Sequence, residues 1–334
     1  MLRASGDEGR RTAQPLPSRW GIWYSAAALV AILAASVPVR AQASHPAGTP
    51  PPRIVPQPSG RSGLNTVLIE ASRIKRQVHR RASRFLSSVT VTYLHDSLPR
   101  WNEPMCPLVA GLPRADGEYI LARVTQIASA AGAPIAGEHC RPNLYIVATP
   151  HPHLLLEKWW TRDPLMYNEC NGLGGIERFL HSKRPVRVWY NVVPQDANGQ
   201  RRPAASLDAP SVGVNLGPTQ GCITSGDGRQ GLSQVIVVID LSQVASLKIG
   251  PLAAYVSMLG LAQIRLTSLP AAPSILALFA PHAPPVAGLT RWDRALLHAL
   301  YHTPQDIGWD GLLEVSRIRN SMTAQLLATP PARR

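Results

Sequence analysis

The residues best suited to chemistry are few in this chain and lie far apart in the sequence. His298 and His302 are separated by about one helical turn, so one helical face could present both imidazoles to a metal ion. A catalytic zinc needs at least one further protein ligand, and no third ligand is evident nearby. His151 and His153 at the start of an expected helix, and Glu138-His139-Cys140 before an expected strand, form no better set. We therefore expect no metal site and no cofactor.

A second group of reactive side chains lies in the glycine-rich stretch Gly217–Gly231. Cys222 is the candidate nucleophile there, but a nucleophilic cysteine needs exposure and a nearby base. A hydrolytic serine would need a histidine partner, and none is identifiable. The chain also lacks the G-x-S-x-G and P-loop motifs. The alternative is a surface loop tethered by a disulfide, with the polar residues Thr224, Ser225, Asp227 and Arg229.

These groups have to be positioned by a mixed framework of strands and helices. Two short apolar strands, Pro107–Gly111 and Asn143–Thr149, flank a helix that Asp116 is expected to cap. Strand, helix and strand form a βαβ unit, whose strands are parallel and whose crossover should be right-handed. The most apolar strand is Leu232–Leu241, and a buried helix, Leu252–Ile264, follows it. The fold class is therefore α/β mixed (α+β), with a βαβ-containing mixed sheet and packed helices in a single main domain.

Weaker patterns place the remaining elements. Ser87–Tyr93 and Pro185–Asn191 alternate like strands, and Trp189 is expected to anchor the second strand by burial. Gly172–Gly175 is expected to break the chain, and Gln195–Gly231 to be mostly loop. Further helices are expected at Asn65–Leu86, Pro152–Trp160, Ile176–His181, Leu289–Tyr301 and Ile307–Leu327.

The four cysteines indicate an oxidising compartment. They are even in number, all lie after residue 43, and none belongs to a C-x-x-C motif. Cys106 and Cys140 each precede one strand of the βαβ unit, so both should lie at the same edge of the sheet, about 5 Å apart. We expect a Cys106–Cys140 disulfide, and by elimination a second one between Cys170 and Cys222.

The N-terminal segment has the pattern of a secretion signal. Arg19 and earlier arginines flank the uncharged run Gly21–Val39, and Ala41-Gln42-Ala43 offers a small-x-small cleavage site. The rival interpretation is an uncleaved inner-membrane anchor, since the run of nineteen residues could just span a bilayer. The expected organisation is a signal peptide at 1–43, a Pro-rich disordered spacer at 44–64, a basic helical segment at 65–87 and an α/β domain at 88–330. The mature protein would be periplasmic or secreted.

Positive charge is concentrated at the start of the mature chain. Residues 44–100 hold nine basic and two acidic residues, whereas 101–334 hold 20 and 16. For an exported protein this excludes nucleic acid as the expected partner and favours an anionic envelope polymer or lipid headgroups. Two plainer interpretations stay open: the excess keeps the protein soluble, or the helix packs on the domain edge. The basic residues of the segment are Arg73, Lys75, Arg76, Arg80, Arg81 and Arg84.

The segments from residue 232 to 302 have a recognisable order. A strand and a helix that contains Gly260-Leu261 precede Ser274-Ile275-Leu276, and a helix then begins at Leu289-Thr290 and contains Asp293. This succession resembles the core of metzincin-type zinc peptidases, whose zinc helix reads H-E-x-x-H-x-x-G-x-x-H. The resemblance covers about a fifth of the chain and implies a zincin-like fold. The whole mature chain also resembles exported bacterial proteins with segments such as CPLVxGL and RPVRVWY, a resemblance that implies no activity.

The groups that this peptidase chemistry needs are missing. With Gly260 on the motif glycine, the ligand and base positions hold Ala253, Ala254, Ser257 and Gln263. Alanine neither ligates zinc nor accepts a proton, and serine and glutamine are poor zinc ligands. The resemblance therefore implies a degenerate metallopeptidase-like fold. We expect a non-enzymatic binding or scaffold module; the alternatives are an envelope hydrolase with an unidentified site and a structural envelope component.

Overall fold

The computed structural model describes residues 61–91, 97–163, 172–195, 229–305 and 311–328, which all belong to one compact unit, Pro58–Arg334. The expected signal peptide and residues 44–60 of the expected spacer lie outside the described residues, whereas residues 61–64, expected to be disordered, belong to the helix Arg61–Val89. Also outside the described residues are Cys170, Cys222, Thr224, Ser225 and Asp227. Among the described helices, none combines the length and the apolar character needed to cross a bilayer.

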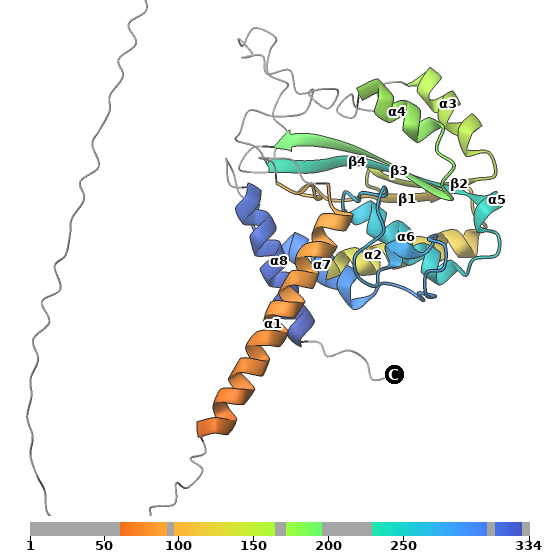
Figure 1. Ribbon diagram of the computed structural model, residues 1–334. Coiled ribbons are helices and arrows are strands. Elements are labelled where there is room, and N and C mark those ends of the chain that lie inside the picture. The colour runs from red at the N-terminus through yellow and green to blue at the C-terminus, as the bar shows by residue number, and fades with distance from the viewer. Residues whose placement is uncertain (1–60, 92–96, 164–171, 196–228, 306–310, 329–334) are drawn as a thin grey trace, which may run out of the picture. The chain divides into compact units, whose positions relative to one another are not determined.

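A four-stranded mixed sheet forms the centre of the unit (Figure 1), in the order β1-β2-β4-β3. The parallel strands are β1 (Pro107–Ala110), β2 (Leu144–Thr149) and β4 (Arg229–Asp240), and β3 (Val186–Gln195) pairs antiparallel with β4. The predicted βαβ unit is thus confirmed for β1 and β2. Central β4 is apolar on both faces, and its residues from Val235 to Ile239 are fully buried, as expected for a strand covered on both sides.

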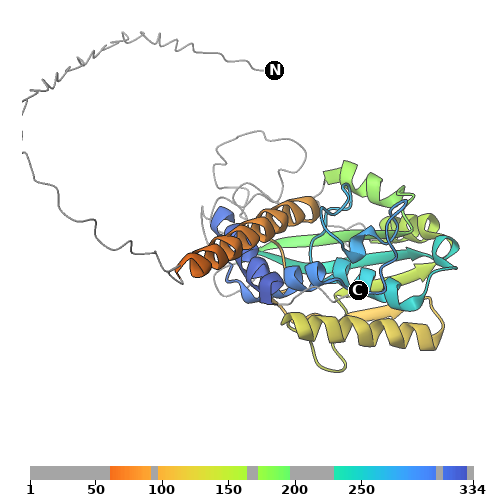
Figure 2. The ribbon, with the colours of Figure 1, turned by 60° about the horizontal axis from the view of Figure 1, so that its bottom comes forward.

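Most helices cover one face of the sheet (Figures 1 and 2). Their apolar faces and the lower face of the strands make one large core, to which α6 contributes ten buried residues. The opposite face carries a smaller cluster, in which Leu156, Phe179 and Trp189 pack on Ile236 and Val238. The helices of the large core are α1 (Arg61–Val89), α2 (Arg114–Ala131), the short α5 (Leu241–Val244), α6 (Ile249–Leu261), the 3-10 helix Ile275–Ala277, α7 (Arg291–His302) and α8 (Gly311–Ala328). Those of the smaller cluster are α3 (Pro152–Arg162) and α4 (Gly172–Leu180).

Local sequence signals fix several helix ends. Gly132 adopts the left-handed conformation after α2, with φ of 82°, and its N–H bonds to the carbonyls of Ala128 and Ser129. Thr290 and Asp293 form a capping box at the start of α7. Asp116 lies in the first turn of α2 but is not its cap, because Pro113 occupies that position.

Two predictions from local pattern were wrong. Ser87–Val89, expected in a strand, continues α1, and only Thr90 forms an isolated bridge, to Ile264. Val89 is 1% exposed and extends the buried helical stripe of Phe85 and Leu86, so packing outweighs the strand preference of β-branched residues. Gly172–Gly175, expected to break the chain, lies within α4.

A disulfide joins Cys106 and Cys140, with Cα atoms 6.0 Å apart, as predicted. The two residues lie beside the parallel strands β1 and β2, whose starts are held together by bonds from Asn143 and Leu144 to the carbonyl of Cys106. The disulfide therefore links the starts of β1 and β2 at one edge of the sheet.

The compact unit starts at Pro58, so it includes α1 together with the residues after 88.

Candidate functional site

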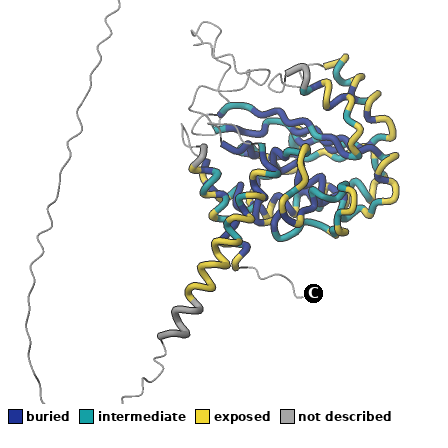
Figure 3. Tube along the Cα trace, in the orientation of Figure 1, coloured by how far each residue is buried: buried dark blue, intermediate teal, exposed yellow. Residues whose placement is uncertain are grey.

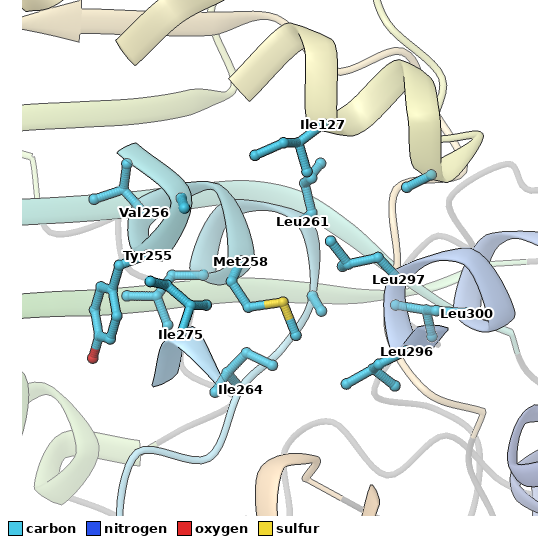
Figure 4. Close-up of a cluster of buried hydrophobic side chains, with 14 of the residues drawn as sticks. Ile127, Tyr255, Val256, Met258, Leu261, Ile264, Ile275, Leu296, Leu297 and Leu300 are labelled. Atoms are coloured by element: carbon cyan, nitrogen blue, oxygen red, sulfur yellow. The ribbon is translucent and has the colours of Figure 1, made fainter. Parts of the chain in front are cut away.

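The helix α6 carries three of the four positions that the sequence resemblance aligns with the zinc ligands and catalytic base of metzincins. Ala253, Ala254 and Ser257 are all 0% exposed. The Ser257 hydroxyl donates to the carbonyl of Ala253 at 2.6 Å, so its proton is used within the helix. Apolar side chains from α2, α6 and α7 fill the space around the helix (Figure 4). These three positions are therefore packed into the core, where no coordination position is open.

Close approach to the sheet explains why the α6 residues are small. A Cβ on Gly260 would lie 3.0 Å from the Leu144 side chain of β2, and Trp101 donates to the Gly260 carbonyl at 2.7 Å. A bulky imidazole at Ala253 or Ala254 would have to displace neighbouring core side chains. The structure separates the fourth position, Gln263, from the others, because it follows the end of α6 and lines a cleft beside β3.

The other segments of the resemblance meet at Asp293, which is 0% exposed. Its carboxylate accepts bonds from the Ser274 hydroxyl, from Ile275 N at 2.9 Å and from both Thr290 N and Thr290 Oγ1 at 2.8 Å. Burial raises the pKa of Asp293, and these donors oppose the shift. The carboxylate thus ties the turn after α6 to the start of α7, which is a structural role.

The histidine candidates do not assemble a metal site. His298 and His302 stack with ring centroids 3.8 Å apart, but Gln325 contacts His298 Nδ1 at 2.8 Å and His302 Nδ1 bonds to the carbonyl of His298. His153 pairs with Glu157 on its own helix. Cys140 is in the disulfide and cannot ligate. Across the described residues there is no cluster of three or more His, Cys, Asp or Glu arranged to hold a metal.

A buried ion pair, which the sequence did not reveal, joins Arg100 to Glu314 of α8. Arg100 is 4% exposed and Glu314 is 0% exposed, and the guanidinium also donates to the carbonyls of Leu300 and Thr303. Burial lowers the pKa of Arg100 to about 9. Its position after Pro99 in an irregular segment gave no signal of burial. The pair fastens the segment before β1 to α7 and α8, and we assign it a structural role.

The six basic residues singled out in the sequence, from Arg73 to Arg84, are all exposed on α1. Arg73, Arg76, Arg80 and Arg84 recur every three or four residues, so they share one side of the helix. The apolar side is buried only in the C-terminal half, where Ala82 and Phe85 enter the core. In the other half Leu68, Ile69 and Ile74 are 64%, 60% and 46% exposed (Figure 3). This half of α1 presents a basic surface next to uncovered apolar side chains.

A cleft of ≈ 470 Å³ lies at the outer edge of β3, the last strand of the sheet. Residues from α4, from β3 and from the segment after α6 line it, among them Arg178, Arg187 and Gln263.

Comparison of the chain with protein-family models, with curated proteins and with solved structures found no match. The assignment of function therefore depends on these local features.

Proposed function

We propose that the protein is a non-enzymatic, exported binding module that attaches to an anionic cell-envelope surface through α1. The observation that carries the non-enzymatic part is the complete burial of Ala253, Ala254 and Ser257. Zinc-dependent hydrolysis needs three protein ligands around an open position for water, and a general base. In α6 the positions aligned with the zinc ligands hold small, buried and closely packed residues, which supports a structural rather than a catalytic role for this helix. The fold would then be a degenerate form of the metzincin-type core.

The binding part rests on the surface of α1. Six exposed cations lie along the helix, and Glu70 is the one acidic residue between residues 61 and 91. Basic side chains near an anionic surface contribute about 1 kcal/mol each, and exposed apolar residues on the same helix add favourable burial. Arg81 lies over the Trp292 ring of α7 at 5.4 Å, which holds the base of the helix against the body. The N-terminal half is therefore presented outward from a fixed support.

The test is co-sedimentation of the mature protein with vesicles containing phosphatidylglycerol, with neutral phosphatidylcholine vesicles, and with purified cell-wall polymer. A lipid-headgroup target predicts binding to the first, and a polymer target predicts binding to the last. In either case Arg73→Gln/Arg76→Gln/Arg80→Gln should weaken binding on the order of a hundredfold, and added salt should weaken the parent as well.

A matched control removes the same charge elsewhere. Arg114, Arg141 and Arg162 are exposed and lie outside α1. Arg114→Gln/Arg141→Gln/Arg162→Gln should bind the anionic target like the parent, because it leaves α1 intact. Equal losses in the two triple variants would mean that net charge alone drives association. No sedimentation of the parent with any anionic target would overturn the binding part outright.

Export is the second component of the proposal, and it rests on the sequence Gly21–Ala43. Signal peptidase is expected to cut after Ala43, which leaves Ser44 as the first residue of the mature chain. N-terminal sequencing of protein from the envelope fraction provides the measurement. A mature chain that starts near Met1 would exclude cleavage and leave the membrane-anchor alternative.

A further inference from the structure

The cleft at the edge of β3 contains a buried cation. Arg187 of β3 is 7% exposed, and its Nη1 donates to the carbonyl of Leu180, at the end of α4, at 2.9 Å. Its Nε is buried and has no hydrogen-bond partner among the residues that the structure describes. No carboxylate among the described residues lies within ion-pair distance of this guanidinium. Arg187 therefore has more donor capacity than the described protein uses.

Burial of the Arg187 guanidinium without an ion-pair partner is energetically unfavourable. Burial penalises the charged form and lowers the pKa of Arg187, and the negative charge of Asp240 offsets this in part. Asp240 itself accepts bonds from Ser242 and Gln243, which hold it at the end of β4 rather than against Arg187. One bond to a helix carbonyl does not explain a buried arginine where an apolar residue would fill the space more cheaply.

Two further arginines line the same cleft. Arg178 of α4 and Arg184 before β3 are both exposed. None of the described residues that line the cleft is acidic. The three guanidinium groups therefore surround a space that attracts a negative charge, and their planar donors match the geometry of carboxylate and phosphate oxygens.

Apolar side chains form the rest of the lining. Val188 and Leu266 are half-buried there, and the ring of Phe179 packs against Trp189 with centroids 5.6 Å apart. A free inorganic anion would leave these groups uncovered, whereas an anion attached to an apolar group would contact both kinds of surface. The volume of ≈ 470 Å³ is that of a small-molecule site.

We propose that this cleft binds an oxyanion, a carboxylate or a phosphate, carried on a ligand with an apolar portion. Arg187 receives the anion through guanidinium N–H groups that the bond to Leu180 leaves unused. Arg178 and Arg184 add charge at the entrance, and Val188, Leu266 and Phe179 contact the apolar portion. The site is separate from α1, so this inference does not depend on the proposed function.

Benzoate and inorganic phosphate serve as probes, each titrated at constant ionic strength against sodium chloride. The thermal midpoint of the parent should rise saturably with at least one probe, and the ¹H–¹⁵N resonance of Arg187 Nε should shift at the same concentrations. A stronger response to benzoate indicates a carboxylate next to an apolar group, and a stronger response to phosphate indicates a phosphate. A response that chloride reproduces, or no response to either probe, overturns the proposal.

Variants locate the site. Arg178→Gln/Arg184→Gln alters only exposed side chains, so it should fold like the parent and bind the effective probe about tenfold more weakly or worse. Arg187→Met should abolish the response while its midpoint without probe stays equal to or above that of the parent. Arg114→Gln and the α1 triple variant should respond like the parent. The proposal is contradicted if the probe raises the thermal midpoint of the double variant as much as that of the parent, or if Arg187→Met unfolds at a much lower temperature than the parent without probe. Either result would mean that Arg187 has only a structural role.

Discussion

The helix α6 and the outer edge of β3 lie in one compact unit, but they differ in whether their buried polar groups are hydrogen-bonded. On α6 the hydroxyl of Ser257 donates to a carbonyl of the helix itself, and Ala253 and Ala254 carry no polar side chain. At the β3 edge, Arg187 is buried beside a cleft, and its Nε has no partner in the described part of the chain. The region that resembles a catalytic centre is thus closed packing, while the region without a recognised motif keeps unused binding capacity.

The largest expected change in stability comes from a substitution in α6. Val256 is 0% exposed within the large core. Val256→Asp should destabilise the protein by about 4–5 kcal/mol, because an unpaired carboxylate would lose its hydration there. Leu269→Asp is the matched control, since Leu269 is 66% exposed and should tolerate the change. Urea unfolding of both variants measures this; a Val256→Asp midpoint equal to that of the parent would mean that α6 is not core.

The disulfide tests the framework that holds both regions. The Cys106–Cys140 bond spans a sequence separation of 34 residues. Its removal in Cys106→Ala/Cys140→Ala should cost roughly 3–4 kcal/mol in the chain-entropy model. Non-reducing peptide mapping is the companion measurement. A peptide joining Cys106 to Cys170 or to Cys222 would contradict the βαβ arrangement itself.

A smaller effect is expected on the cleft side of the sheet. Trp189 is 4% exposed, packs against Phe179 and donates to Asn191 at 2.7 Å. Trp189→Ala should therefore lower the free energy of unfolding by about 3 kcal/mol. The measurement is the denaturation midpoint, with Leu154→Ala as control because Leu154 is 65% exposed. An unchanged midpoint for Trp189→Ala would show that the smaller cluster contributes nothing to stability.

The framework could be predicted from the sequence because its signals are local. The apolar run of β4 predicts a buried strand, and the helical spacing in α2 and α6 predicts two helices. The glycine after α2 predicts the end of that helix. The cysteine pairing followed from the parallel strands that those elements imply. Ser87–Val89 was misassigned because the deciding contacts of Val89 are long-range packing contacts in the core.

The candidate site could not be predicted in the same way. Arg187 alternates with Trp189 on a strand and looks like any exposed edge residue, and its burial depends on α4 covering that face. Arg100 and Glu314 are over two hundred residues apart in sequence, so no local pattern connects them. By contrast, the absence of zinc-ligating side chains at Ala253, Ala254 and Ser257 was readable from residue types alone. Absence of chemistry can be seen in a sequence, whereas a new site requires the fold.

The central claim, that the α6 region is packing and not a metal centre, is tested most directly by the metal content of freshly purified protein. Elemental analysis of the protein, prepared without chelators or a metal-affinity step, should find zinc only at the background level of a control protein. The physical reason is that Ala253 and Ala254 cannot ligate and that the Ser257 hydroxyl is bonded within the helix. Stoichiometric zinc that survives dialysis would contradict this account.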